Sequence, residues 1–433
     1  MDVGLGVGSG WRAPRAGLAL ALAAWLGACA GTPRGVLAPV AATVPGASRV
    51  DILVATTRKE AATAGEMYSG ERGPALAYAD ITVSIPPDAV RAPGTVQWPR
   101  SLPGDPATDF VTLRADTLDR MEATSRLRRQ TARSGRRQVL VFVHGFNNRF
   151  EDAVYRFAQI VHDTRAEVVP VLFTWPSRGS VLAYGYDRES TNYSRNALEG
   201  VLRRLARNPE VDEITVLAHS MGNWLVLESL RQMAIRDGRV AGKIRNVVLA
   251  APDVDVDLAR EAFRDMGPGR PKLSLFVSQD DNALAVSRLV WGSGGARLGA
   301  IDPGAEPYRS ELARENIAVL NLTDAKSDDA LNHGKFAGSP QLVALLGRRL
   351  AQGQTVTDSR VGLGDRIVQM TAGAAATVGT AAGLAVSAPV AVIDAQSRET
   401  YGEHLRNLGQ GLGDTAGATV DLATAPARAL SGR

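Results

Sequence analysis

Short apolar segments alternate with longer helical stretches along most of this 433-residue chain. The segments are apolar on both faces, a pattern typical of strands in a parallel sheet that helices cover on each side. The alternation therefore predicts an α/β fold with a mostly parallel central sheet. The predicted strands are residues 138–143, 168–174, 214–218, 244–250, 273–278 and 317–322, and the predicted helices are residues 150–164, 193–206, 224–235, 258–265 and 341–351.

The predicted domain extends from residue 50 to residue 351, because two further β-branched segments, 51–56 and 79–85, precede the alternating part. Hydrophobic residues make up 45% of the chain and charged residues 22%, which excludes a fibrous or wholly disordered protein. A net charge of +4 gives no domain-wide surface for nucleic acid. Six arginines within 126–137 indicate a solvated helix and loop, with a surface for anionic lipid or cell-wall polymer as the alternative.

Near the amino terminus, two arginines are followed by a short apolar run, Ala16–Ala28. The run is too short to cross a bilayer but matches the apolar stretch of a secretory signal peptide. It ends in Leu26-Gly27-Ala28-Cys29, which resembles the lipobox of bacterial lipoproteins. The resemblance implies a signal peptide over residues 1–28, a lipid-modified Cys29 and a flexible tether over residues 29–49. An ordinary cleaved signal with a coincidental cysteine is the alternative.

The lipoprotein resemblance also predicts where the protein resides. Cys29 is the single cysteine of the chain, so an intramolecular disulfide does not explain it, whereas two or three acyl chains would attach it stably to a membrane. Ala30 follows in place of the Asp that retains lipoproteins in the inner membrane, which favours the outer membrane of a bacterial cell envelope. The tail 352–433, rich in Ala and Gly, is predicted to be helical or partly disordered, and its uncharged segment 367–393 to pack rather than to span a membrane.

The strongest chemical motif is Ala218-His219-Ser220-Met221-Gly222, which lies between a predicted strand and a predicted helix. A turn in this context lifts a serine above the sheet and exposes its hydroxyl as a nucleophile. Small residues two before and two after the serine let strand and helix approach closely. Gly222 meets that demand, and Ala218 adds one methyl group where Gly is usual. The alternative is a serine that caps the helix.

A second motif, His144-Gly145-Phe146-Asn147, ends the predicted strand 138–143. Acyl transfer develops negative charge on an oxygen, which preorganised backbone N–H groups stabilise. Sites with such a nucleophile turn take one N–H from the residue after the serine, here Met221, and the other from this earlier loop, here Phe146 by position. His144 is then expected to shape the loop and not to act as the base.

Four motifs together resemble an uncharacterised bacterial family of α/β-hydrolases, described only as members of the esterase/lipase superfamily. Besides the two motifs above, they are Phe173-Thr174-Trp175-Pro176-Ser177 and Ala250-Ala251-Pro252-Asp253. The resemblance covers residues 50–351 and implies the α/β-hydrolase fold. It extends to neither the signal segment nor the tail.

The resemblance implies a catalytic triad in the chain order Ser, acid, His. His333 follows the last strand and is the expected general base; His404 lies in the Gly-rich tail. Asp281 is the leading acid, because it follows the strand 273–278 and has an apolar residue three positions on. The alternative acids are Asp253, which follows the preceding strand, and Asp280.

The implied function is hydrolysis of carboxylic esters (EC 3.1.1.-) by an envelope-anchored serine hydrolase through an acyl-enzyme. The motifs leave open whether an ester, a thioester or an amide is cleaved. A non-catalytic envelope lipoprotein that uses the scaffold for binding is the alternative. No cofactor is implied, and no metal: Asp253, Asp255 and Asp257 alternate like calcium ligands but lack the Gly and the terminal Glu of an EF-hand. The expected partners are a small or lipid-like ester and the membrane.

Overall fold

The computed structural model describes residues 32–343, except 42, 135–136, 292–294, 326–328, 330 and 340–341. The predicted signal peptide 1–28, Cys29, the tail 352–433 and most of the predicted helix 341–351 lie outside the described residues. Within the described ranges, no helix combines the length and the apolarity that crossing a bilayer requires.

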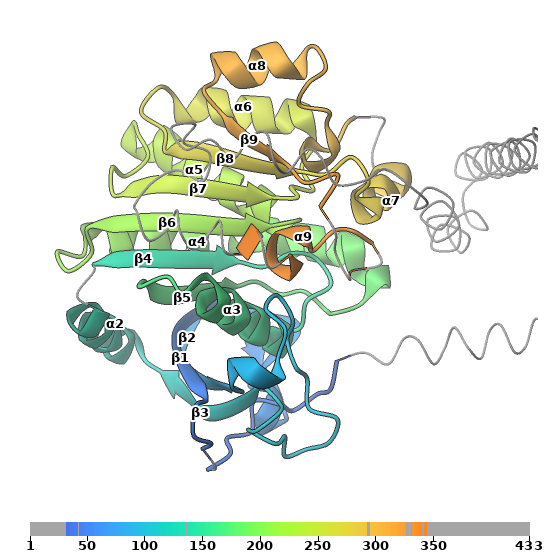
Figure 1. The fold of residues 1–433 in the computed structure, drawn as a ribbon. Helices are drawn as coiled ribbons and strands as arrows, with labels where there is room; N and C mark the ends of the chain where they lie inside the picture. Colours follow the sequence, from blue (N-terminus) through green and yellow to red (C-terminus); the bar gives the residue numbers. More distant parts are fainter. Residues whose placement is uncertain are drawn as a thin grey trace, which may run out of the picture.

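A nine-stranded sheet forms the centre of the described part of the chain (Figure 1). Its strand order is β3-β2-β1-β5-β4-β6-β7-β8-β9. The first three strands pair antiparallel and all others parallel, so the predicted mostly parallel sheet is confirmed. The strands are β1 (Ser48–Glu60), β2 (Tyr68–Ile85), β3 (Val111–Leu118), β4 (Gln138–Val143), β5 (Val169–Thr174), β6 (Glu213–His219), β7 (Ile244–Ala250), β8 (Lys272–Val277) and β9 (Ala318–Asn321).

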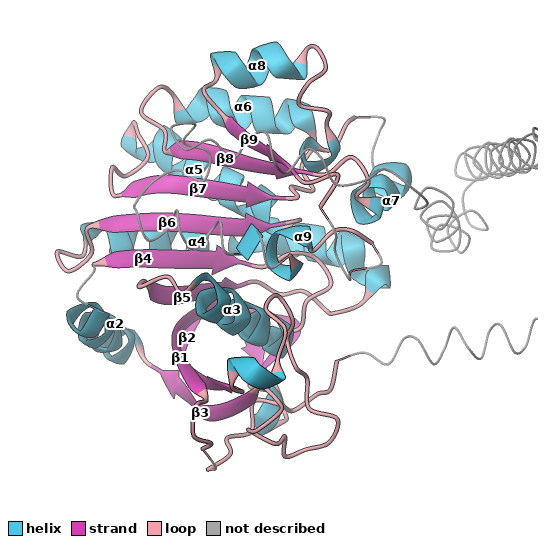
Figure 2. Cartoon of the chain, viewed as in Figure 1, coloured by secondary structure: helices cyan, strands magenta, loops and turns pink. Residues whose placement is uncertain are grey.

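Helices cover both faces of the sheet, with α3 in front and α4, α5 and α6 behind in the view of Figure 2. The α-helices are α2 (Arg120–Ser134), α3 (Phe150–Thr164), α4 (Tyr184–Arg207), α5 (Gly222–Asp237), α6 (Val256–Met266), α7 (Asn282–Trp291), α8 (Tyr308–Arg314) and α9 (Lys335–Gly338). Short 3-10 turns are η1 (Ala64–Glu66), η2 (Asp88–Val90), η3 (Val181–Ala183) and η4 (Leu298–Ala300). The expected arrangement with helices on both faces is confirmed.

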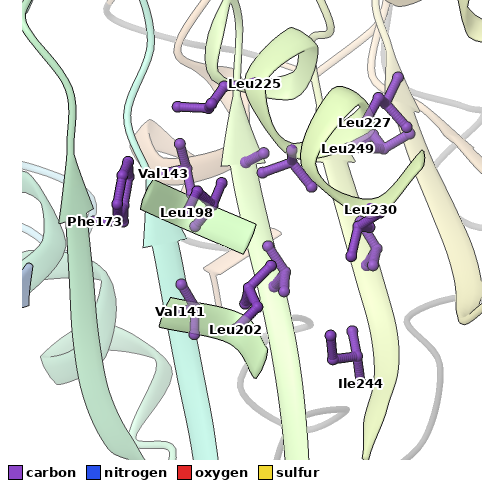
Figure 3. Packing of buried hydrophobic residues seen from close by; sticks show 14 of the residues in the cluster. Val141, Val143, Phe173, Leu198, Leu202, Leu225, Leu227, Leu230, Ile244 and Leu249 are labelled. Atoms are coloured by element: carbon purple, nitrogen blue, oxygen red, sulfur yellow. The ribbon is translucent and has the colours of Figure 1, made fainter. Parts of the chain in front are cut away.

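Successive residues of β4 alternate between two apolar cores, one on each face of the sheet. Val141 and Val143 lie in the core that contains Leu198 of α4 (Figure 3), whereas Leu140 and Phe142 lie in the core under α3. Burying a side chain of this size stabilises the fold by roughly 1.5–3 kcal/mol relative to leaving it exposed. The strands are therefore held firmly on both faces, and their carboxyl ends fix the starting points of the loops described below.

Several elements differ from the sequence prediction, among them α8 and α9, which form where no helix was expected, and β2, which begins at Tyr68 and not at residue 79. β3 forms where no strand was expected, and it pairs with β2 along most of its length. Helix α4 begins at Tyr184, well before the predicted start at Tyr193. Its first turns bury polar side chains, Asp187 and Ser190 among them, and carry no apolar periodicity. A prediction based on apolar spacing therefore starts the helix too late.

The expected tether over residues 29–49 is wrong for the stretch from Thr32. Val36 and Leu37 are buried, and the Leu37 N–H donates to the Gly65 carbonyl. Tyr155 of α3 donates its hydroxyl to the carbonyl of Val36 at 2.9 Å. Residues 48–49 already belong to β1. The apolar pair at 36–37 finds a place in the core between α3 and the antiparallel strands, which Pro, Ala and Gly content alone does not reveal.

Candidate active site

Ser220 lies in a sharp turn between the end of β6 and the start of α5. Its φ angle is +52°, a left-handed conformation that is unusual and strained for a residue with a side chain. The Ser220 N–H donates to the carbonyl of Ala250 on the neighbouring strand at 3.0 Å, and the Asp253 N–H donates to the carbonyl of Ser220 at 3.2 Å. Hydrogen bonds from the next strand and its loop thus hold the strained turn that the sequence motif predicted.

We call the sharp turn at Ser220 the elbow turn. Two glycines allow the elbow turn and the loop after β4 to approach each other. A Cβ on Gly222 would lie 2.3 Å from the carbonyl oxygen of His144. A Cβ on Gly145 would lie 2.7 Å from the Cβ of Ser220. Because real Cβ atoms do not come this close to other atoms, both positions require Gly. The His144–Asn147 loop therefore lies directly against Ser220.

His333 and Asp281 are brought together although 52 residues separate them. His333 Nδ1 and Asp281 Oδ2 are 2.7 Å apart, and the Asp281 side chain is fully buried. The other carboxylate oxygen accepts the N–H of Leu284 in the first turn of α7 at 3.0 Å. Burial alone would lower the pKa of His333, but Asp281, with Asp253 and Asp329, raises it above its usual value.

The loop that carries His333 is fixed by a second carboxylate and by the residue before Ser220. Asp329 Oδ2 accepts the N–H groups of His333 and Gly334 at 2.8 and 2.7 Å. The carbonyl of His333 lies 3.2 Å from His219 Nε2. Because a carbonyl only accepts, His219 carries its proton on Nε2, and burial holds the pKa of His219 well below its usual value. The loop that carries His333 therefore lies beside the turn of Ser220.

The two alternative acids have other partners. Asp280 forms an ion pair with the buried ammonium of Lys335 at 2.7 Å and accepts from the amide of Asn332. Asp253 is buried and accepts the hydroxyls of Tyr184 and Ser287 at 2.8 and 2.7 Å. Among the three carboxylates weighed from the sequence, Asp281 alone contacts the ring of His333.

His144 ends β4 and is held in one tautomer. Its Nε2 faces two donors, the Trp175 N–H at 3.2 Å and Arg58 Nη2 at 3.3 Å, so this nitrogen must be the acceptor. Its Nδ1 therefore carries the proton, which points to the carbonyl of Gly145 at 2.9 Å. Burial first, and the Arg58 charge second, lower the pKa of His144 to about 3. His144 is consequently neutral at physiological pH.

Arg58, a residue that the sequence reasoning did not select, reaches from β1 under this loop. It is 2% exposed and donates to the carbonyls of Ser69, Ser177 and Asn148 at 3.1, 2.8 and 2.8 Å, in addition to its contact with His144. Burial lowers the pKa of Arg58 to about 10, so the guanidinium stays charged near neutral pH. Its sequence signal is weak, because Arg58 is the first of three charged residues, Arg58-Lys59-Glu60, that follow an apolar run.

Asp187, also not selected from the sequence, supports the loop from the first turn of α4. Its carboxylate accepts the N–H of Arg178 at 3.1 Å and the N–H of Asn147, whose φ is +58°, at 3.4 Å. The ring of Phe146 packs edge-on against Tyr184 with centroids 5.2 Å apart. A buried carboxylate and an aromatic contact thus orient the segment that follows His144.

The N–H groups of Phe146 and Met221 have no hydrogen-bond partner among the described residues. The Gly145 carbonyl accepts from His144, and carbonyl and N–H point in opposite directions across a trans peptide. The Phe146 N–H is therefore directed away from His144. Met221 precedes α5, where the helix dipole is positive. Neither N–H group is therefore bound by another group in the part of the chain that the structure describes.

No group of three His, Cys, Asp or Glu side chains in the described part of the chain is arranged to hold a metal ion. Asp253 faces Arg297 at 3.3 Å, and Asp255 caps α6 by accepting the N–H of Asp257. Both carboxylates thus bind groups of the protein.

The sheet, the elbow turn and the histidine loop beside it define an α/β hydrolase. Residues 119–349 match the family model described as "Alpha/beta hydrolase of unknown function (DUF900)". Because this match covers more than half of the chain, the protein belongs to that family. The resemblance to an uncharacterised α/β-hydrolase family is thereby confirmed.

Three individual proteins resemble parts of the chain. "Uncharacterized protein alr1448" of Nostoc sp. is 40% identical over 62 residues, which is 14% of this chain and 16% of that relative. A protein assigned as a cell surface hydrolase, from Lactobacillus plantarum WCFS1, is 10% identical with a TM-score of 0.30 over 50% of this chain and 92% of its own. The RedJ thioesterase from the prodiginine biosynthetic pathway of Streptomyces coelicolor is 17% identical with a TM-score of 0.27, over 50% and 86%. Similarity at this level says nothing about the substrate of the present chain.

Proposed function

We propose that this α/β hydrolase is a serine hydrolase that cleaves carboxylic esters with Ser220 as nucleophile, His333 as base and Asp281 as acid. The observation that carries the proposal is the 2.7 Å contact between His333 Nδ1 and the buried Asp281 carboxylate, beside the turn of Ser220. A histidine that donates through Nδ1 to a carboxylate leaves its Nε2 free to accept a proton.

The reaction would run through an acyl-enzyme. His333 Nε2 takes the hydroxyl proton of Ser220 as its oxygen attacks the ester carbonyl, and Asp281 stabilises the imidazolium. The Phe146 and Met221 N–H groups bind the developing oxyanion, each such donor being commonly worth about 3–4 kcal/mol. His333 then protonates the leaving alcohol, and a water activated by the same histidine releases the acid.

Labelling with a fluorophosphonate probe tests the nucleophile. The full chain should be labelled at neutral pH, the Ser220→Ala chain should not, and the probe should abolish hydrolysis of a p-nitrophenyl ester. Labelling that persists in Ser220→Ala, or no labelling of the unchanged chain, would favour the non-catalytic binding protein. A series of ester, thioester and amide substrates then identifies the bond that is cleaved.

We also propose that Cys29 is lipid-modified and anchors the hydrolase to the cell envelope, with the outer membrane favoured. The support is the apolar run that ends in Leu26-Gly27-Ala28-Cys29 and the absence of any other cysteine from the chain. Cys29→Ser should move the protein from the membrane to the soluble fraction and leave esterase activity intact. A Cys29→Ser chain that stays with membranes after a high-salt wash would contradict the lipid anchor.

A further inference from the structure

The described chain starts at the rim of the candidate site. The carbonyl of Thr32 accepts from Arg149 Nη2 at 2.6 Å, and its hydroxyl donates to Asp152 at 2.5 Å. Arg149 lies three residues after Phe146 and directly before α3. Thr32 is therefore bound at the end of the sheet where the carboxyl ends of the parallel strands lie. In Figure 1 this start of the chain, in blue, lies on the side toward which the β4 and β7 arrowheads point.

Two exposed apolar side chains lie close in the sequence to a glycine that packs on Arg149. Leu182 and Val181 of η3 are 86% and 62% exposed, and Leu182 is the most exposed large hydrophobic residue of the described part. Gly179, two residues earlier, packs so closely on Arg149 that a Cβ there would lie 2.4 Å from Arg149 Cγ. Arg149 thus connects the start of the described chain with η3. We call Thr32, Arg149 and residues 179–182 the anchor rim.

The distance from the lipobox cysteine to the anchor rim is short. Thr32 is the third residue after Cys29, and an extended chain spans at most about 3.3–3.6 Å per residue, so the two are at most about 10 Å apart. A flexible tether of about 20 residues would instead leave the domain about 25 Å from its anchor on average. A lipid on Cys29 would therefore hold the anchor rim against the bilayer and restrict the orientations of the domain.

We propose that the anchor rim lies on the bilayer surface, with Val181 and Leu182 inserted among the lipids, and that the Ser220 site hydrolyses esters presented from that surface. The inference rests on the proposed serine-hydrolase function and on the Cys29 anchor. It narrows the substrate class to membrane-resident, water-insoluble carboxylic esters. The lipid on Cys29 would attach the domain to the membrane, and the apolar pair would fix its orientation, because buried apolar area adds to membrane binding.

Two substrates separate membrane docking from catalysis. The full chain is reconstituted on vesicles of phosphatidylethanolamine and phosphatidylglycerol, with p-nitrophenyl palmitate in the bilayer or p-nitrophenyl acetate in solution. Val181→Ser/Leu182→Ser should lower palmitate hydrolysis about tenfold, since each lost apolar contact weakens docking. Acetate hydrolysis should stay within about twofold, because neither residue belongs to the proposed catalytic machinery.

Ile235→Ser is the matched control. Ile235 is 63% exposed and lies at the opposite end of α5 from Ser220. It should leave both rates unchanged. Equal palmitate rates in Val181→Ser/Leu182→Ser and Ile235→Ser would overturn the docking proposal alone. Acetate hydrolysis that persists in a Ser220→Ala chain would instead overturn the proposed function.

A fluorescent reporter tests orientation independently of activity. With Cys29 acylated, Leu182→Cys or Ile235→Cys supplies one thiol for an environment-sensitive dye, and the unchanged chain reports any residual labelling of Cys29. Addition of vesicles should shift the emission of the dye at position 182 to shorter wavelength and leave that at position 235 unchanged. Equal shifts at the two positions would contradict a specific membrane-facing rim.

Discussion

The loops that carry His144 and His333 both lie against the elbow turn, yet their imidazoles meet opposite surroundings. His144 is buried against a cation, Arg58, and its pKa falls to about 3. His333 is also enclosed, but its partner is the Asp281 carboxylate, and its pKa rises above the usual value. The charge of the partner, and not the residue type, thus separates a histidine that stays neutral from one suited to accept a proton.

The two loops are also held by different means. The N–H groups of the His333 loop are bound by Asp329, a neighbour in the sequence, and Lys335 of the same segment pairs with Asp280, 55 residues earlier. The His144 loop is fixed by Arg58 and Asp187, which come from remote parts of the chain. The segment of His333 therefore supplies some of its own support, whereas Arg58 of β1 and Asp187 of α4 support the loop of the proposed oxyanion half.

Replacing each histidine gives the largest expected contrast. His333→Ala should lower kcat for a p-nitrophenyl ester by about 10⁵–10⁶-fold, because the nucleophile loses its base. His144→Ala should lower kcat by only about 10²-fold, through a misplaced Phe146 N–H. Steady-state kinetics on both variants, with circular dichroism to verify folding, measures the difference. Equal losses would mean that the assigned roles of the two histidines are wrong.

The acids provide the next contrast. Asp281→Asn should lower kcat about 10⁴-fold, because the amide cannot stabilise the imidazolium and favours the wrong tautomer. Asp253→Asn should lower kcat by less than about tenfold, since Asp253 binds Tyr184 and Ser287 rather than His333. Its main effect should be a lower melting temperature, from the broken pairing with Arg297. The reverse order of activities would make Asp253 the acid.

Arg58 tests whether the oxyanion half depends on a distant residue. Arg58→Met should lower kcat about 10²–10³-fold with KM nearly unchanged, because one oxyanion donor is displaced. Arg126, buried in α2 with Asp80 as its partner at 2.7 Å, is the matched control. Arg126→Met should lower the melting temperature but leave kcat in the folded fraction unchanged. A similar kcat for the two folded variants would remove Arg58 from the positioning role.

The smallest of the expected effects is a change in the pH at which kcat/KM falls. His333 acts as a base only when neutral, and its pKa lies above the usual 6.5, so kcat/KM should fall as the pH drops through a value above 6.5. In Asp281→Asn the residual activity should fall at a lower pH, because the charge that raises the pKa is gone. His144 should add no second limb near neutral pH. If the fall of kcat/KM at low pH occurs at the same pH in Asp281→Asn, the group that titrates is not His333.

Much of the fold followed from local patterns. The parallel strands appeared as short apolar runs because both of their faces are buried, and β4 and β7 match their predicted bounds. Ser220 was selected from a turn motif, and its strained φ angle agrees with the shape that the motif demands. Asp281 and His333 were selected from their places after strands, and the fold brings them together.

The residues that support the His144 loop from other parts of the chain were not predicted. Arg58 and Asp187 are charged side chains in otherwise ordinary segments, and only the packing of β1 and α4 around the loop buries them. Val36 and Leu37 looked like part of a linker, because two apolar residues among Pro, Ala and Gly show no periodicity. Such contacts depend on the register of the antiparallel strands, which single-sequence patterns do not fix.

The packed segment after Thr32 also has a consequence for handling the protein. The Val40 N–H donates to the carbonyl of Thr112, and the Thr112 hydroxyl donates to the carbonyl of Val36, so this segment covers the free edge of β3 at the start of the strand. An uncovered edge strand invites pairing with another molecule and then aggregation. A recombinant chain that starts at Ser48 would leave this edge and the pocket of Leu37 bare. The practical amino-terminal boundary of a soluble enzyme therefore lies at or before Thr32.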